Sequence, residues 1–289
     1  MSTVIHWFRR DLRLADNAAL YHALKSGNNV QCIFIFDTEI LNKLESKDDA
    51  RVSFIHKELC AIDQELKELG SGLHVYCGNP TEIWPQIIQK YQPTGVYANN
   101  DYEPYAITRD QKIKDLLYTK NAPFHTFKDH VIFEMDEILK GDGTPYVVYT
   151  PYSRKWKAAL TADHLEPYPT EKYFNRFYKT ETMDMVSLEE MGFTKSEINF
   201  PSKTTTLGTI KNYEAKRNFP AIEGTSRLSV HFRFGTVSIR NKTAKGKKTS
   251  EKWLNELIWR DFYIQILYHF PHVVGNSFRP KYDAVRWSK

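Results

Sequence analysis

The amino-acid sequence predicts an α/β fold: an N-terminal doubly wound parallel sheet of the Rossmann-like type, a long connector, and an all-helical second domain. In the first part, short apolar runs alternate with segments of helical period, at the spacing typical of βαβ units. The alternation is lost after Asp129, and the signals become helical from Lys203 onward. The 289 residues are enough for two units. We expect the three parts to be residues 1–130, 131–204 and 205–289.

Each element of the first part has its own sequence signal. Short runs rich in β-branched and aromatic residues predict strands. The segments between them carry apolar residues at helical spacing, and Gly27 and Gly70 close the first two helices. The predicted strands are residues 4–8, 30–36, 73–77, 95–98 and 124–127. The predicted helices are residues 17–26, 49–69, 81–91 and 106–119.

Two polar segments, residues 9–13 and 99–103, directly follow predicted strands. Ligands of parallel sheets bind beyond the carboxyl ends of the strands, so we expect both segments at such a site. No G-x-G-x-x-G pattern follows the first strand, which disfavours an ordinary dinucleotide-dependent enzyme.

The connector lacks the alternation of the first part. Gly141 and Gly143 flank Asp142 between apolar residues, which predicts a tight turn or hairpin. Farther on, prolines are frequent and periodic apolar residues are few. We therefore expect a long connection that wraps the surface of the first domain.

Residues 225–229 read Thr-Ser-Arg-Leu-Ser and stand directly behind Gly224. Three hydroxyls and a guanidinium ahead of an apolar run are typical of a helix start, and a helix start binds phosphate well. The alternative is that Thr225 or Ser226 only caps its own helix.

Residues 253–263 predict a long helix. Leu254, Ile258 and Phe262 recur at i, i+4 and i+8, which makes one apolar stripe for the core.

The opposite face of that helix carries a carboxylate, an indole, a guanidinium and a phenol, from Glu256, Trp259, Arg260 and Tyr263. Such a surface can stack a flat heterocycle, accept hydrogen bonds from its amide edge and hold a nearby phosphate. The alternative is a solvated face with one half-buried tryptophan.

Two further features flank these segments. Tyr213 and Arg217 lie one helical turn apart, a pair that, taken alone, more often reflects surface packing. Residues 240–248 are basic and interrupted by Gly246, and we expect a mobile solvated loop. Its position between the two segments would bring it near any bound DNA.

Composition limits the partner and the compartment. The net charge of +5 and the pI of about 8.8 are compatible with nucleic acid without demanding it. Three widely spaced cysteines form no CxxC pair and indicate buried thiols in a reducing compartment. No apolar run is long enough to span a membrane, and charges interrupt the N-terminus where a signal peptide is apolar. We expect a cytoplasmic monomer with no membrane partner and no metal site.

Three segments closely resemble the photolyase/cryptochrome family, and most of all its class I members, which act on cyclobutane pyrimidine dimers in DNA. They are residues 225–229, the WLNELIWRDFY run at 253–263, and Arg-Arg-Asp-Leu-Arg-Leu at 9–14, followed by Asp16-Asn17. The resemblance covers most of the chain. It implies an N-terminal domain for a light-harvesting antenna chromophore and a helical domain for FAD and damaged DNA.

The resemblance also implies roles for individual residues. FAD is expected to contact Tyr213, Thr225, Ser226, Arg227, Leu228, Ser229 and Trp253. DNA is expected at Arg217, Glu256, Trp259, Arg260 and Tyr263, with Glu256 and Trp259 as the catalytic pair that holds the lesion. Trp287 matches the outermost tryptophan of an electron relay.

The antenna chromophore varies within that family. Residues 99–106 read Asn-Asn-Asp-Tyr-Glu-Pro-Tyr-Ala and lack the Asn-Glu pair that folate-binding members carry after Tyr-Glu. A folate antenna is therefore disfavoured, while a deazaflavin or flavin antenna and an empty pocket both stay open.

The resemblance leads to one functional hypothesis with two alternatives. The first is light-driven repair, in which reduced FAD donates an electron to a dimer flipped out of the duplex. The alternatives are a cryptochrome-type photoreceptor without repair activity and an inactive fragment. The sequence ends at Lys289, ahead of a segment with which photolyases continue around the flavin. We therefore expect the chain alone to bind flavin weakly or not at all and not to photoreduce it, while its first domain stays folded.

Overall fold

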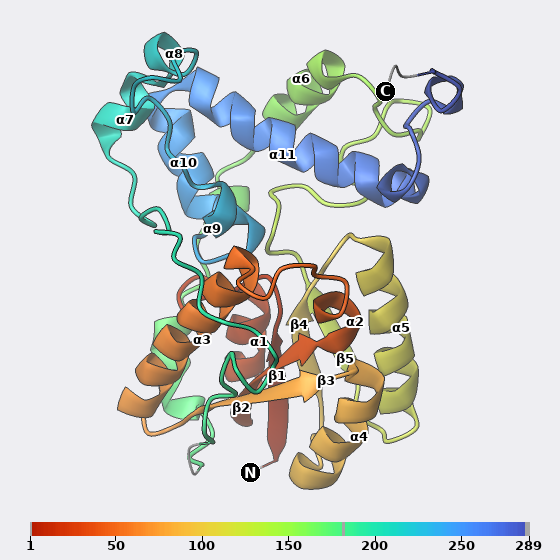
Figure 1. Ribbon diagram of the computed structural model, residues 1–289, viewed down its shortest axis with the longest axis vertical. Coiled ribbons are helices and arrows are strands. Elements are labelled where there is room, and N and C mark those ends of the chain that lie inside the picture. Colours follow the sequence, from red (N-terminus) through yellow and green to blue (C-terminus); the bar gives the residue numbers. More distant parts are fainter. Residues whose placement is uncertain (1, 181–182, 287–289) are drawn as a thin grey trace.

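A computed structural model describes residues 2–180 and 183–286. The molecule has two halves, one above the other in Figure 1. The α/β half contains the sheet, and the helical half is crossed by the long helix α11 (Glu251–His269). Trp287, the expected relay tryptophan, lies outside the described residues.

Five parallel strands form one sheet in the order β3-β2-β1-β4-β5. The chain starts at the central strand, builds one side and then the other, which is the doubly wound topology. All five predicted strands are confirmed close to their expected limits. They are β1 (Thr3–Phe8), β2 (Asn29–Asp37), β3 (Leu73–Gly78), β4 (Val96–Asn99) and β5 (Phe124–Phe127).

Helices cover both faces of the sheet. Side chains alternate along a strand, so β1 directs Val4 and Phe8 into one core, with α1 and α3, and Ile5 and Trp7 into the other, with α4 and α5. The four predicted helices are confirmed, and a short helix, α2, follows β2 directly. The bounds are α1 (Ala18–Lys25), α2 (Thr38–Leu41), α3 (Ala50–Glu68), α4 (Pro80–Tyr91) and α5 (Pro104–Tyr118).

The connector divides between the two halves. Its first part forms the expected tight turn, in which the N–H of Gly143 donates to the carbonyl of Lys140 at 3.0 Å. Ile132, Tyr152 and Trp156 then pack into the core of the helical half, so the expectation that the whole connector wraps the first domain is wrong. Its later part does pack on the α/β half. The connector contains α6 (Tyr149–Ala159) and two 3-10 helices, η1 (Asp163–Leu165) and η2 (Thr170–Arg176).

The basic run at residues 240–248 is a helix, α10 (Ile239–Thr249), not the predicted mobile loop. The Ser238 side chain caps its start by accepting from the N–H of Asn241. Arg240 and Lys242 are buried, and the ammonium of Lys245 donates to the carbonyl of Thr205 at 2.6 Å. The high positive charge disguised this helix in the sequence, because Arg240, Lys242 and Lys245 have partners inside the protein while Lys247 and Lys248 are exposed.

The other elements of the helical half are short and surround α11. They are α7 (Leu207–Lys211), α8 (Tyr213–Lys216), α9 (Ser229–Arg233), η3 (Pro271–Val274) and η4 (Pro280–Tyr282).

Three sequence expectations concern groups away from the core. Cys32 is buried and Cys77 is partly buried, but Cys60 is exposed, so the expectation of three buried thiols is wrong for Cys60. In the described part of the chain, no helix combines the length and the apolar character needed to cross a membrane. Residues 2–180 and 183–286 contain no cluster of potential metal ligands.

Candidate functional site

A cavity of about 640 Å³, here called the upper cavity, opens in the helical half beside the α/β half. Its walls are the loop ahead of α9, one face of α11, the start of α8 and Arg10 from the α/β half. Three segments that are far apart in the sequence therefore meet here. The predicted site residues in its lining are Tyr213, Thr225, Ser226, Arg227, Leu228, Ser229, Trp253, Glu256, Arg260 and Tyr263.

The loop ahead of α9 presents its hydroxyls to the cavity and not to its own helix. Arg227 has a left-handed φ of +49°, and α9 starts only at Ser229. No side chain caps this helix, so the alternative that Thr225 or Ser226 serves only as a helix cap is wrong. Thr225, Arg227 and Ser229 are all exposed at the cavity wall.

Close packing holds this loop in place. A Cβ atom on Gly224 would lie 2.7 Å from the carbonyl oxygen of Lys216, so a larger residue does not fit there. Leu228 is buried in the helical core, and the indole N–H of Trp253 donates to the Ser226 hydroxyl at 3.3 Å. The hydroxyl-rich loop thus has a defined position relative to α11.

The helix α11 forms the opposite wall. The Ser250 side chain caps it by accepting from the N–H of Trp253 at 3.3 Å. Leu254, Ile258 and Phe262 are buried, which confirms the predicted apolar stripe. The face that carries Glu256, Arg260 and Tyr263 therefore points to the cavity.

Arg217 and Glu256 form an ion pair between the segment after α8 and α11. The Arg217 guanidinium also lies 5.4 Å from the centroid of the Tyr213 ring. Tyr213 and Glu256 line the cavity, and Arg217 does not. The predicted Tyr213–Arg217 pair is thereby connected to the carboxylate of the predicted catalytic pair.

Trp259 does not line the cavity. Its ring is stacked on Tyr149, with ring centroids 3.6 Å apart and an interplanar angle of 4°. On α11 itself, Tyr263 also stacks on Trp259, at 5.5 Å and 23°, and Tyr263 does reach the cavity. The sequence did not reveal the role of Tyr149, because it lies more than a hundred residues away, in the connector.

Arg260 is a largely buried cation in the cavity wall. Its guanidinium donates to the carbonyl oxygens of His130 and Phe232. Burial lowers the pKa of Arg260 to about 10, with partial compensation from Asp261, so the guanidinium stays charged at neutral pH. Backbone carbonyls leave its positive charge available to the cavity.

Asp261 is fully buried next to Arg260, at 3.8 Å. It accepts from the indole N–H of Trp156 and from the N–H of Ile132, both at 3.1 Å. Burial raises the pKa of Asp261 to about 6. Sequence reasoning missed this residue, since an aspartate beside an arginine on a helix gives no sign of burial.

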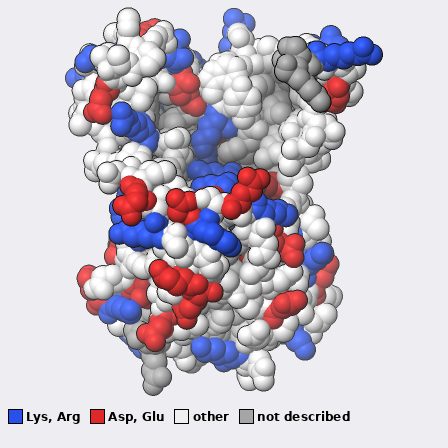
Figure 2. All heavy atoms as spheres, in the orientation of Figure 1, with Lys and Arg blue, Asp and Glu red and all other residues white. Residues whose placement is uncertain are grey.

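Positive charge dominates the upper cavity. Arg10, Arg227, Arg233 and Arg260 line it, against one carboxylate, Glu256. Figure 2 shows Lys and Arg atoms gathered in the hollow between the two halves. Hydroxyls, four guanidinium groups and aromatic rings together suit an anionic ligand with a flat ring.

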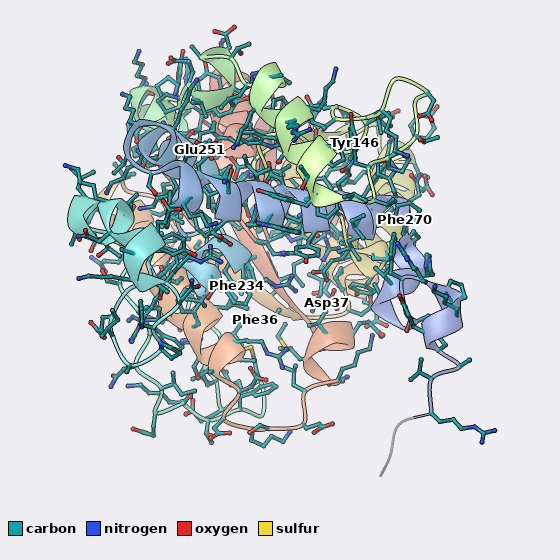
Figure 3. The ribbon with its side chains drawn as sticks, turned by 90° about the horizontal axis from the view of Figure 1, so that it is seen from above. Phe36, Asp37, Tyr146, Phe234, Glu251 and Phe270 are labelled. Carbon is teal, nitrogen blue, oxygen red and sulfur yellow. The ribbon has the colours of Figure 1, made fainter. Side chains whose placement is uncertain are left out.

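A smaller cavity of about 230 Å³, here called the lower cavity, lies at the carboxyl ends of β1 and β2. In Figure 3, Phe36 and Asp37 from the end of β2 lie near Phe234 from the helical half, and all three line this cavity. Its lining includes members of both predicted segments, 9–13 and 99–103. The expectation that these segments meet at a ligand-sized site is supported.

Arg10 and Arg233 line both cavities. The Arg10 guanidinium lies 3.0 Å from Asp101 and 2.8 Å from Glu103, and Arg233 lies 2.6 Å from the same Glu103 oxygen. A small group of charges therefore separates the two cavities and joins the two halves.

Comparison with known proteins identifies two matching families. The family of DNA photolyase matches residues 4–172, and the FAD binding domain of DNA photolyase matches residues 253–289. Deoxyribodipyrimidine photo-lyases of Halobacterium salinarum and of a Synechococcus species are 31% and 29% identical to this chain, each over 98% of it. The chain spans only 65% and 64% of the length of these two relatives.

A similar solved structure is that of an archaeal photolyase from Sulfolobus tokodaii, described as containing two FAD molecules with implication of a novel light-harvesting cofactor. It is 27% identical, with a TM-score of 0.80, over 99% of this chain and 64% of that one. The expected arrangement, an α/β domain followed by a helical FAD-binding region, is confirmed by these matches.

Proposed function

The chain belongs to the DNA photolyase family, and on that premise we propose that it binds FAD and lesion-containing DNA for light-driven repair of cyclobutane pyrimidine dimers. One observation carries this proposal. A single cavity brings together the hydroxyl-rich loop at residues 225–229, Tyr213 and the α11 face with Glu256.

The residues of the upper cavity fit the phosphates of FAD. Thr225, Ser229 and Arg227 are exposed along one wall, behind a glycine whose close approach to Lys216 leaves no room for a side chain. Trp253 is buried behind them at the cavity wall, and its indole N–H donates to the Ser226 hydroxyl. When bound, reduced FAD supplies the light-driven electron that splits the dimer.

The chain's own residues position the lesion. A pyrimidine dimer pairs and stacks poorly, so flipping it out of the duplex costs less than flipping a normal base. Glu256 would accept hydrogen bonds from the polar edge of the dimer, and Trp259 would stack on it. Arg217, through its ion pair with Glu256, would hold that carboxylate in place and would contact the neighbouring phosphate, and Arg260 keeps the wall positive.

The lower cavity is the proposed site of a second chromophore. Phe36, Phe234 and Trp7 offer aromatic surface, and Arg51 and Arg109 offer positive charge. A flavin-like antenna suits this lining better than folate, for which the residues after Tyr102-Glu103 do not match.

Equilibrium binding in the dark tests the central proposal. Fluorescence anisotropy would compare a duplex with one cyclobutane thymine dimer and the same duplex undamaged, with FAD present. We expect the damaged duplex to bind more tightly, and Glu256→Gln to remove most of that preference while Glu251→Gln, at the exposed start of α11, leaves it unchanged. Equal affinity for the two duplexes would contradict repair and favour a photoreceptor or a non-catalytic chain.

A further inference from the structure

Trp259 is enclosed in a stack of three aromatic rings. Tyr149 lies nearly parallel against one face, with ring centroids 3.6 Å apart and an interplanar angle of 4°, and Tyr263 stacks more loosely at 5.5 Å and 23°. Both tyrosines contact the indole, and the described residues show no ring contact between Tyr149 and Tyr263, as expected for rings on opposite faces.

Tyr149 is anchored at both ends. Its hydroxyl donates to the carbonyl of Asn255 on α11 at 2.9 Å. Burial, with a further contribution from Glu256, raises the pKa of Tyr149 to about 12, so this donor keeps its proton at neutral pH. Tyr149 is also the first residue of α6, which packs across α11, as the crossing of these two helices in Figures 1 and 3 shows.

Tyr263 is attached far less firmly. Its side chain is 62% exposed, and within the described residues its hydroxyl makes no hydrogen bond. It lines the upper cavity, which Trp259 itself does not line, and its ring stacks on the Trp259 indole. Moving it costs the loose stack and little else.

We propose that Tyr149 is a positioning residue for lesion recognition. It fixes the Trp259 indole from behind, and the flipped-out dimer takes the place of Tyr263 on the opposite face of that indole. The inference rests on the proposed function and adds a residue from the connector to it. An indole already held in its binding orientation loses little side-chain entropy when the dimer arrives, which strengthens binding to the lesion.

Undamaged DNA tests the selectivity of this arrangement. Its bases stay stacked in the duplex and do not reach Trp259, so the orientation of the indole matters little for them. A defect at Tyr149 should therefore change the affinity for damaged DNA and leave the affinity for undamaged DNA unchanged.

The test uses Tyr149→Leu, which keeps an apolar side chain but removes the aromatic stack. Tyr149→Phe keeps the ring and loses only the hydroxyl, and Tyr118→Leu, at a tyrosine that is 83% exposed on α5, is the matched control. The readout is the ratio of dissociation constants for undamaged and dimer-containing duplex. We expect Tyr149→Leu to lower this ratio roughly 2- to 10-fold, while Tyr149→Phe restores most of it and Tyr118→Leu leaves it unchanged. Equal losses for both duplexes, or no loss, would overturn the inference.

A spectroscopic measurement separates this inference from the proposed function. The difference in near-ultraviolet circular dichroism between the unmodified chain and Trp259→Phe isolates the signal of the stacked indole. The same difference should collapse in a Tyr149→Leu background and survive in Tyr149→Phe. A signal that survives in Tyr149→Leu would mean that Tyr149 does not hold Trp259. If the signal collapses but the unmodified chain does not distinguish the two duplexes, the proposed function and the lesion-binding part of the inference are both wrong.

Discussion

Two sets of charged residues connect the α/β half to the helical half, and they differ in their access to water. The first, here called the buried ring, consists of Arg13, Asp16, Asp129 and Arg240. The second, here called the open bridge, consists of Arg10, Glu103 and Arg233.

The buried ring is almost free of solvent. Arg240 contacts Asp16 at 2.8 Å and Asp129 at 2.7 Å, and Arg13 contacts Asp129 at 2.6 Å. The Asp129 side chain is 0% exposed and that of Arg240 is 6% exposed. Burial alone would raise the pKa of Asp129, but Arg13 and Arg240 hold it well below its usual range. Every charge here has a partner inside the protein, so the ring has no charge left for a ligand.

The open bridge uses the same residue types at the cavity walls. The side chains of Glu103 and Arg233 are 36% and 52% exposed. Water screens such a pair, and its net stabilisation is small. The comparison shows that burial, and not the presence of an ion pair, separates a charge that holds the fold from one that is available to a ligand.

Removing Arg240 should have the largest effect. Arg240→Ala leaves two buried carboxylates with one cation, and breaking such a buried pair costs about 3–5 kcal/mol of unfolding free energy. Urea denaturation followed by circular dichroism measures this loss. Arg154→Ala, at an exposed position on α6, is the control and should change stability by less than about 0.5 kcal/mol.

Asp261 is a buried carboxylate that lies farther from its nearest cation, Arg260, than the carboxylates of the buried ring lie from theirs. It therefore tests what burial does when pairing is weaker. The folded-state pKa is raised to about 6, so folding holds the proton and stability falls as pH rises from about 4 to about 6. That shift of roughly two pH units corresponds to about 3 kcal/mol. Asp261→Asn should flatten this part of the stability profile in urea titrations at several pH values. If the dependence of stability on pH stayed the same in Asp261→Asn, another titrating group would be its cause.

Arg233 should matter for ligands and little for folding. Arg233→Gln removes a charge-assisted contact of about 1–2 kcal/mol to an anionic ligand, or roughly 5- to 30-fold in FAD affinity. Equilibrium dialysis measures the affinity, and urea denaturation should show unchanged stability. Loss of stability on the scale of Arg240→Ala would remove the distinction between ring and bridge.

The smallest effect is expected at Glu103. Glu103→Gln should change the unfolding free energy by only about 0–1 kcal/mol, and added salt should abolish that difference by screening the pair. The salt dependence is checked by repeating the denaturation at low and high ionic strength. A large, salt-independent loss would show that the bridge behaves like the buried ring.

The predicted and observed structures agree best where the signal is local. The strands of the α/β half and the apolar stripe of α11 follow from the period of apolar residues, because each element buries one defined face. The prediction of a loop at residues 240–248 was wrong for the same reason. The pattern of a sequence shows only which residues are apolar, and α10 buries two cations, Arg240 and Lys242, against distant partners.

The candidate site also divides into features that local sequence predicts and features that it does not. The loop at residues 225–229 and the polar face of α11 could be recognised from their residues and from the family resemblance. Their meeting in one cavity, the ion pair between Arg217 and Glu256, and the stack of Tyr149 on Trp259 could not, because each joins residues that are separated by dozens of positions in the chain.

The sequence by itself determined the class of fold, the position of the hydroxyl-rich loop and the residues that one helical face of α11 presents, since these depend on local spacing. Only the tertiary structure decided which charges are desolvated and which remain open to a ligand. Arg13 and Arg10 are three positions apart in the same segment, yet one belongs to the buried ring and the other lines both cavities. Desolvation depends on everything that packs around a group, and that packing is set by residues from the whole length of the chain.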